Sequence, residues 1–358
     1  MVSERAKARS GDRVDLPRAS DSPLSEAYDA ALLDLDGVVY LGGAAIPKAP
    51  EALAAARRHG MRLAFVTNNA SRTPSAIATE LNLLGVPADP AEVVTSAQAA
   101  AHLIADKVPP GAPVLVVGGM GLRLALRERG LRPVSTAAEK PAAVVQGYAA
   151  GVDYGLLAEG ALAVRAGAWF VASNADPTLP TQRGLQPGNG SMVQVIATAT
   201  GTEPVVAGKP EPPLHAETVA RTGAKRPLVV GDRLDTDIEG AVRVGADSLL
   251  VLTGVSHPAD AVLALPNRRP SYLAHDLSGL LEPHPAVVVA DGEFQCGGWT
   301  ACRRPVQATH DGHAERLEIA GGGAAIDGLR ALCAAAWSGG AVTADSVAHA
   351  VGSLRFPG

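Results

Sequence analysis

The chain has 358 residues; 47% of them are hydrophobic but only 3% are aromatic, and the formal net charge at pH 7 is −5. A negative charge argues against non-specific binding of nucleic acid, and no apolar run reaches the roughly 20 residues that would span a membrane. Three cysteines are too few for a disulfide framework, so we expect a cytoplasmic protein with a core rich in Ala, Val and Leu.

The first part of the chain alternates between predicted strands and helices. Residues 1–27 come before this pattern, and we expect them to form a disordered tail. The predicted elements that follow are strand 30–33, helix 50–59, strand 61–66, helix 74–84 and strand 93–96. Alternation of this kind predicts an α/β fold with a parallel, Rossmann-like sheet and right-handed crossovers.

The alternation starts again near residue 97. Strands are predicted at 114–117, 142–146 and 168–172, with helices between them. The first unit then resumes and is complete by about residue 280. We therefore expect a core made of residues 28–97 and 203–280, with residues 98–202 inserted as a second α/β unit, a cap.

Polar side chains that suit a phosphate and a metal ion follow four strand ends of the predicted core. They are Asp34 and Asp36, Thr67 and Asn68, Lys209, and Asp232 and Asp237. In an open parallel sheet, ligands bind beyond the carboxyl ends of the strands. Neighbouring carboxylates repel each other, and a divalent cation relieves that repulsion. The combination predicts a phosphate site assisted by Mg²⁺.

The same residues lie in four short motifs. The motifs are Asp34-x-Asp36-Gly37, Thr67-Asn68-Asn69, Gly208-Lys209-Pro210 and Gly231-Asp232-x-x-x-Thr236-Asp237. They resemble the motifs of the haloacid dehalogenase (HAD) superfamily over about residues 28–280. The insertion is similar to the branch with a large α/β cap, which includes phosphoglycolate, pyridoxal phosphate, p-nitrophenyl phosphate and glycerol 3-phosphate phosphatases. Composition and a C-terminal appendage are most similar to the glycerol 3-phosphate phosphatases of actinobacteria.

The resemblance implies a phosphatase that works through a phosphoaspartate. Asp34 would attack phosphorus, and Asp36 would protonate the leaving alkoxide and then activate water. Mg²⁺ would be held by Asp34, the backbone carbonyl of Asp36, and Asp232. Asp237 would hold metal-bound waters or steady Lys209.

The resemblance also implies which residues bind the phosphate and which substrate is hydrolysed. Thr67, Asn68 and Lys209 would bind the oxygens of the transferring phosphoryl group. The expected substrate is a small phosphorylated metabolite, most closely glycerol 3-phosphate, with phosphoglycolate or pyridoxal phosphate as alternatives. An alternative of another class is a non-catalytic sensor or scaffold that acts through the C-terminal appendage.

The cap should close over the site, exclude water and supply specificity. Asn174, Asp176 and Arg183 lie on predicted cap loops, and each is a candidate for contact with the leaving group. The alternative for each is a polar residue that stabilises its loop. A homodimer through the cap or the appendage is also open.

The appendage, residues 283–358, does not belong to the phosphatase pattern. Strands are predicted at 285–290 and 316–320, and Gly321-Gly322-Gly323 precedes a helix over 325–337. This order resembles the acetyl-CoA loop of acetyltransferase-type folds, but the Arg/Gln-x-x-Gly-x-Gly pattern is missing and the segment is about half a domain. We expect a small, truncated α+β module with a regulatory or dimerising role.

The appendage also carries four residues of metal-ligating type, Cys296, Cys302, His310 and His313. Their spacing lies outside the common zinc-finger ranges, which favours ordinary cysteines of a small β-unit over a zinc site.

Overall fold

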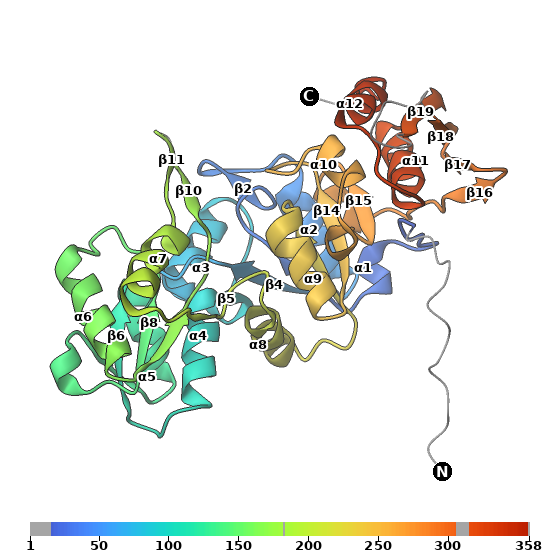
Figure 1. Ribbon diagram of the computed structural model, residues 1–358. Coiled ribbons are helices and arrows are strands. Elements are labelled where there is room, and N and C mark those ends of the chain that lie inside the picture. Colours follow the sequence, from blue (N-terminus) through green and yellow to red (C-terminus); the bar gives the residue numbers. More distant parts are fainter. Residues whose placement is uncertain (1–15, 182, 306–314, 357–358) are drawn as a thin grey trace, which may run out of the picture.

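The computed structural model describes residues 16–181, 183–305 and 315–356. Its core is a six-stranded parallel sheet in the order β15-β14-β13-β1-β4-β5 (Figure 1). These strands are β1 (Ala30–Leu33), β4 (Arg62–Thr67), β5 (Val93–Thr95), β13 (Pro227–Gly231), β14 (Asp247–Val251) and β15 (Tyr272–Ala274). The predicted parallel α/β core is confirmed.

Helices cover both faces of this sheet because both faces are apolar. In β1, Ala31 and Leu33 belong to one buried cluster, and Ala30 and Leu32 belong to another. Leucine and isoleucine side chains of two core helices close the first cluster. Three core helices contribute to the second, which also includes apolar side chains of the inserted unit such as Leu122 and Leu126. The helices are α2 (Ala49–Arg58) and α3 (Pro74–Leu83) on the first face, and α4 (Ser96–Ala105), α8 (Pro212–Thr222) and α9 (Glu239–Arg243) on the second.

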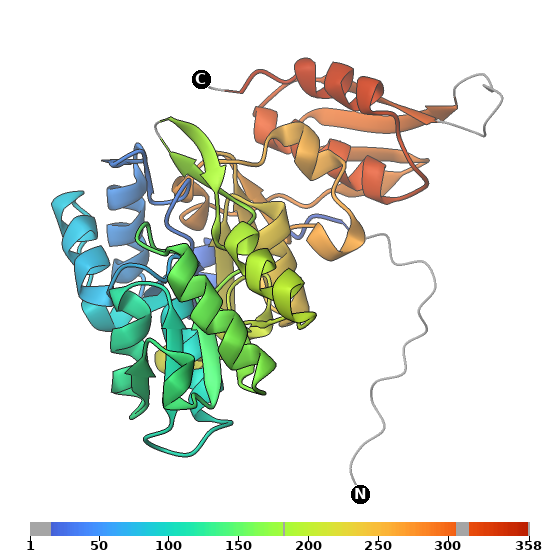
Figure 2. The same ribbon diagram turned by 60° about the vertical axis from the view of Figure 1, so that its left-hand side comes forward.

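The inserted unit has a parallel sheet of its own, in the order β12-β9-β8-β6-β7. Its strands are β6 (Pro113–Val117), β7 (Arg132–Val134), β8 (Ala143–Gln146), β9 (Trp169–Ala172) and β12 (Val205–Val206), and its helices are α5 (Met120–Glu128), α6 (Tyr154–Arg165) and α7 (Asn189–Thr200). Figure 2 shows this cap beside the core. The boundary at residue 202 stays a prediction, and β12, just beyond it, pairs with β9 of the cap sheet.

Several local elements differ from the sequence-based expectation. The loop expected before α7 contains a hairpin, β10 (Thr178–Thr181) and β11 (Gly184–Pro187), and a second small hairpin pairs β2 (Tyr40–Leu41) with β3 (Ala44–Ala45). Helix α7 begins at Asn189, directly after Gly188. A π-helical turn, Leu234–Ile238, precedes α9, which is a feature often found at functional sites.

The expectation of disorder up to residue 27 is wrong for residues 16–27. A short helix, α1 (Leu24–Ala27), holds Leu24 fully buried in the core, and Ser20 bridges to His284. Burial of the Leu24 side chain and the backbone pairing of Ser20 hold residues 16–27 against the folded core. Residues 1–15 lie outside the described residues.

The appendage is an antiparallel sheet of four strands in sequence order, with two helices packed on it. Its elements are β16 (Val288–Ala290), β17 (Glu293–Cys296), β18 (Trp299–Pro305), β19 (Glu315–Gly321), α11 (Ala325–Trp337) and α12 (Ala344–Gly352), and α10 (Pro258–Val262) of the main body packs against both helices. Three of these elements, β17, β18 and α12, had no predicted counterpart. The acetyltransferase likeness stays a prediction.

A buried arginine joins the appendage to the core. Arg330 of α11 donates to the carbonyl oxygen of Leu273 at 2.6 Å and lies 3.1 Å from His284 Nδ1. Cys296 and Cys333 are buried and Cys302 is half-buried, whereas His310 and His313 lie outside the described residues. Every helix in the described part of the chain is too short or too polar to cross a lipid bilayer.

Candidate active site

Lys209 joins the carboxyl ends of three core strands. Its ammonium nitrogen lies 2.5 Å from Asp34 Oδ1 beyond β1 and 2.7 Å from Asp237 Oδ1 in the turn after β13. It also donates to the carbonyl oxygen of Val66 in β4, at 3.3 Å. Lys209 is only 4% exposed, so this ammonium depends on the two carboxylates for its charge balance.

The charges in this cluster shift one another's titration. Burial raises the pKa of Asp34 well above its usual range, against the opposing effect of Lys209. Burial also disfavours the Lys209 ammonium, but Asp237 and Asp34 outweigh that effect and raise the pKa of Lys209. Burial, with the charge of Asp237, raises the pKa of Asp232 to about 6. The site therefore holds more negative charge than one lysine neutralises.

A cation would complete this arrangement. Oxygen atoms of Asp34, Asp232 and Asp237 lie within 4.8 Å of one another. Asp232 Oδ2 accepts a hydrogen bond from the Val255 amide at 2.7 Å, but its buried Oδ1 has no partner among the described residues. An orphaned buried carboxylate oxygen within a group of acids fits Mg²⁺, which prefers oxygen ligands.

Two glycines make room for these carboxylates. Gly37 has a φ of +81°, and a Cβ atom there would lie 2.5 Å from Asp232 Oδ2. A Cβ atom on Gly231 would lie 2.2 Å from the Cβ atom of Asp237. Both distances are below any real contact, so the glycines of the first and fourth motifs are required by packing.

Asp36 lies two residues beyond Asp34 and is exposed, in contrast to the buried cluster. Partial desolvation raises its pKa, and the negative charge of Glu80 acts in the same direction, whereas Lys209 and Arg72 lower it. An exposed carboxyl group with a raised pKa beside a buried carboxylate suits proton transfer to and from a ligand.

The second motif, Thr67-Asn68-Asn69, is hydrogen-bonded to the third motif at Lys209. Thr67 is 4% exposed and its Oγ1 accepts from the Asn69 amide at 3.1 Å. The side chain of Asn68 accepts from the Lys209 amide at 2.8 Å and donates to the Lys209 carbonyl at 3.1 Å. The carboxamide of Asn68 is thus occupied by the third motif. The phosphate contacts expected of Thr67 and Asn68 stay a prediction.

The cap meets the core at Asn68. The side-chain Nδ2 of Asn68 donates to Asp176 Oδ2 at 3.1 Å. The backbone carbonyl oxygen of Asn68 accepts from Asn174 Nδ2 at 2.7 Å. Asn174 is 5% exposed, and its Oδ1 accepts from the Asp176 amide at 3.2 Å. In the structure, both residues hold the cap against the second motif. Arg183 lies apart, exposed at the turn of the β10–β11 hairpin.

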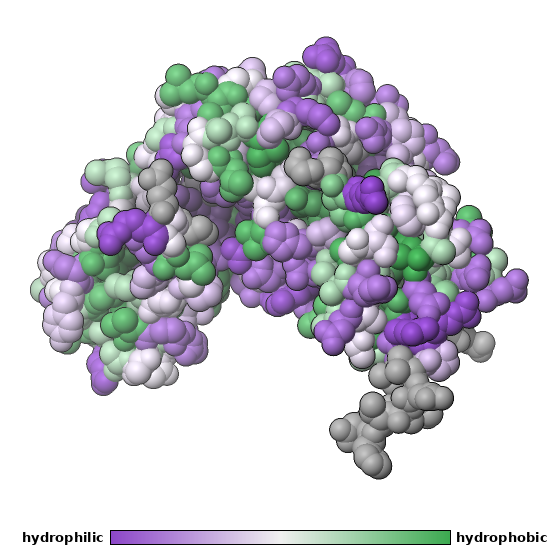
Figure 3. Space-filling view, turned by 90° about the horizontal axis from the view of Figure 1, so that it is seen from above, coloured by the Kyte–Doolittle hydropathy of each residue, from purple (hydrophilic) through white to green (hydrophobic). Residues whose placement is uncertain are grey.

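The surface of the molecule is recessed beside the cap. Seen from above, the molecule is hollowed between the cap and the rest of the chain, and hydrophilic residues are visible in the hollow (Figure 3).

Sequence reasoning missed two groups near the site. Arg233 directly follows Asp232; its guanidinium binds Asp235, and its amide donates to Asp237 Oδ2 at 3.2 Å. Its place inside the fourth motif was a signal that could have identified it. His215 is buried behind the cluster, and burial together with the Lys209 charge lowers its pKa to about 4. Nothing in the sequence marks that histidine.

Comparison with known families gives two matches. The model of a family described as haloacid dehalogenase-like hydrolase matches residues 31–132. A second, described as HAD-hydrolase-like, matches residues 206–280. The two matches cover the parts of the chain that carry all four motifs.

Comparison with individual proteins gives similar chains over most of the length. The D-glycerol 3-phosphate phosphatase of Mycobacterium tuberculosis is 47% identical over 317 residues, which are 88% of this chain and 87% of that protein. A 5′-nucleotidase of Bacillus subtilis is 40% identical over 64% of this chain and 90% of its own. A crystal structure of the M. tuberculosis glycerol phosphate phosphatase in complex with magnesium has a TM-score of 0.81 at 42% identity, covering 93% of this chain and 99% of that one.

Proposed function

Because the chain belongs to the haloacid dehalogenase-like hydrolases and its relatives named above act on phosphate esters, we propose that it hydrolyses glycerol 3-phosphate to glycerol and phosphate with bound Mg²⁺. The observation that carries the chemistry is the buried cluster in which Lys209 bridges Asp34 and Asp237 beside the unpartnered oxygen of Asp232. The likeness to the M. tuberculosis enzyme carries the choice of substrate.

The proposed reaction has two steps. An oxygen of Asp34 attacks phosphorus, the bond from phosphorus to the glycerol oxygen breaks, and Asp36 gives its proton to that oxygen. Water then attacks phosphorus of the aspartyl phosphate, passes a proton to Asp36, and releases phosphate and Asp34. Lys209 neutralises Asp34 so that the carboxylate can approach an anionic ester. Two easier transfers replace one very slow hydrolysis.

Mg²⁺ would be held by Asp34, Asp232 and the carbonyl oxygen of Asp36, with Asp237 beside them. It supplies charge neutralisation for the phosphoryl oxygens. We keep Thr67, Asn68 and Lys209 as the proposed phosphate ligands. Thr67 ends β4 and Asn68 follows it, and the occupied side chain of Asn68 leaves its backbone amide for this role.

The test is phosphate release from a panel of esters, with Mg²⁺ or with EDTA. The panel contains glycerol 3-phosphate, phosphoglycolate, pyridoxal phosphate, p-nitrophenyl phosphate and a nucleoside 5′-monophosphate. We expect the highest kcat/KM for glycerol 3-phosphate and loss of all activity with EDTA. A higher value for another ester would change the substrate, and no release from any ester would favour the sensor or scaffold alternative.

Two broader expectations remain predictions. The protein would act on a small phosphorylated metabolite in the cytoplasm, and a homodimer would form through the cap or the appendage. Analytical ultracentrifugation of the intact chain checks the second point, and a sedimentation coefficient of the monomer at micromolar concentration would contradict it.

A further inference from the structure

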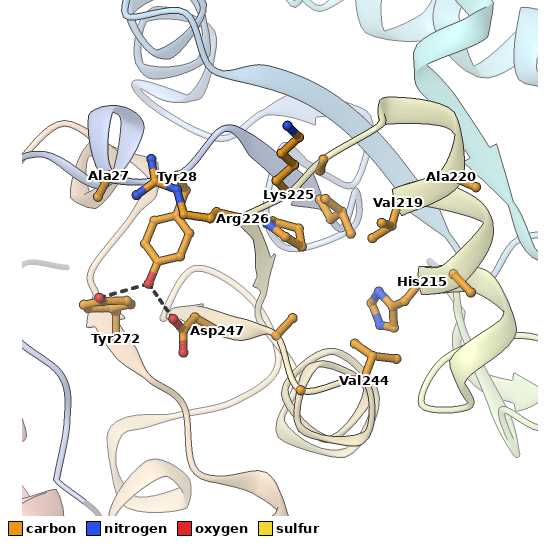
Figure 4. A pocket seen from close by; sticks show the side chains of 16 residues that line it. Ala27, Tyr28, His215, Val219, Ala220, Lys225, Arg226, Val244, Asp247 and Tyr272 are labelled. Atoms are coloured by element: carbon orange, nitrogen blue, oxygen red, sulfur yellow. Dashed lines mark hydrogen bonds between the residues drawn. The ribbon is translucent and has the colours of Figure 1, made fainter. Parts of the chain in front are cut away.

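A cavity of about 850 Å³ lies at the edge of the core sheet opposite to the candidate active site (Figure 4). Its lining includes Pro227, Asp247 and Tyr272, which are the first residues of β13, β14 and β15. Tyr28, just before β1, also lines it. Asp34, in contrast, follows the last residue of β1. The cavity and the active site therefore lie at opposite ends of the same strands.

The walls of the cavity are largely apolar but contain one buried polar ring. Val219 of α8 and Val244 after α9 line it together with His215. His215 is 1% exposed, and neither of its ring nitrogens has a hydrogen-bond partner among the described residues. Figure 4 shows the His215 ring across the open space from Tyr28. A buried imidazole without a partner calls for a ligand or an ordered water.

The rim of the cavity is positively charged. Asp247, the one carboxylate among the lining residues, is paired with Arg18. Lys225 and Arg226 are exposed, and neither side chain has an ion pair within the part of the chain that the structure describes. Two uncompensated cations at the mouth of an apolar cavity favour an anionic ligand.

We propose that this cavity binds a small organic anion with an aromatic or short aliphatic body. The apolar body would pack on Val219 and Val244, and His215 would offer one N–H donor and one acceptor. The anionic group would lie at the rim to which Lys225 and Arg226 contribute their positive charge. The volume lies in the range of small-molecule sites. The proposal does not depend on the proposed phosphatase function.

The test uses 1-anilinonaphthalene-8-sulfonate, an aromatic anion whose fluorescence rises on binding. We expect saturable binding of one molecule per intact chain. Val244→Trp should weaken that binding by about tenfold or more, because the larger side chain fills the cavity. Val244 is 37% exposed, so the substitution does not disturb the core, and the circular dichroism midpoint checks the fold. Val242→Trp on α9, 41% exposed and outside the cavity, is the matched control.

Charge is tested separately. The double variant Lys225→Glu, Arg226→Glu should weaken binding of the sulfonate by about tenfold, and the uncharged N-phenyl-1-naphthylamine should bind more weakly than the sulfonate. Equal binding by the Val244→Trp and Val242→Trp variants would overturn the proposal. Displacement of the sulfonate by inorganic phosphate with Mg²⁺ would also overturn it, since the probe would then occupy the active site.

Discussion

The two parallel sheets of this protein use their carboxyl edges in different ways. At the edge of the core sheet, buried charges are paired around Lys209. At the edge of the cap sheet, the buried amide of Gln146 and hydroxyl of Ser173 have no hydrogen-bond partner among the described residues. A Cβ atom on Gly121 would lie 2.4 Å from the carbonyl oxygen of Ala70 in the core. The core edge is built to hold charge, and the cap edge is built to approach the core closely.

The largest expected effect comes from removing the central cation of the core edge. Lys209→Met leaves Asp34 and Asp237 without the ammonium group that balances their charge. We therefore expect a loss of kcat/KM of at least about 1,000-fold, which is the order of magnitude for catalytic groups that act together. The free energy of unfolding should fall by about 3–5 kcal/mol. Activity assays and urea denaturation measure both.

A matched control for that variant is Lys140→Met, since Lys140 is exposed on the cap. Its free energy of unfolding should stay within about 0.5 kcal/mol of the intact protein. A Lys209→Met protein that keeps more than a tenth of the activity would show that the charged cluster is not the catalytic one.

The cap edge is tested by Asn174→Ala, which removes the hydrogen bond to the Asn68 carbonyl oxygen. Because this residue joins cap and core, kcat/KM should fall by about tenfold, and by the same factor for glycerol 3-phosphate and p-nitrophenyl phosphate. Steady-state kinetics with both esters measure the two factors. A loss confined to one ester would instead make Asn174 a ligand of the leaving group.

A second junction between the cap and the core lies at Glu217 of α8. Its buried carboxylate binds His102 and accepts from Arg129 and Arg221, both at 2.7 Å. Burial raises its pKa, but the hydrogen bonds outweigh that effect and the net shift is downward. A carboxyl group with a lowered pKa stabilises the fold above its unfolded value near 4.5, and this contribution is lost as the pH falls through the folded value.

Glu217→Gln should therefore lower the free energy of unfolding by about 2 kcal/mol at pH 7, and the difference should shrink below pH 4.5. Thermal or urea denaturation across this pH range measures it, with the exposed Glu203→Gln as the control. A difference that is the same at every pH would mean that the charge of Glu217 does not contribute.

The smallest expected effect is at the tip of the cap hairpin. If Arg183 contacts the leaving group, Arg183→Ala should raise KM for glycerol 3-phosphate by about two- to tenfold and leave kcat nearly unchanged. Initial-rate measurements separate the two constants. The exposed Arg127→Ala on α5 is the matched control, and equal KM values in the two variants would remove Arg183 from the site.

The core and its site could be predicted from the sequence because the information is local. Asp34 and Asp232 each directly follow an apolar strand of the core sheet, and parallel strands bring such ends together. Lys209 lies three residues after β12, which pairs with the cap sheet, so its place beside the two acids depends on tertiary packing. The contacts that each side chain makes in the folded protein could not be predicted from the sequence. The carboxamide of Asn68 is occupied by the backbone of Lys209, which lies 141 residues away.

The remaining structure depends on contacts between distant segments. Glu217 meets His102 and Arg129 only because α8 packs on α4, which in turn packs on α5. Strand β17 alternates polar and apolar residues over only four positions, and β18 has no such alternation, so neither strand was predicted. The short hairpin β10–β11 lies in a segment that was predicted as loop. Tertiary packing, rather than local preference, decides these elements.

The most direct test of the central claim is a rapid-quench experiment on the Asp36→Asn variant with p-nitrophenyl phosphate and Mg²⁺. Nitrophenolate leaves without protonation, so Asp34 can still be phosphorylated, whereas hydrolysis of the aspartyl phosphate loses its base. We predict a burst of about one nitrophenolate per chain and a phosphorylated Asp34 peptide in mass spectrometry, both absent after Asp34→Asn. Turnover without a burst, together with activity that survives Asp34→Asn, would contradict the account.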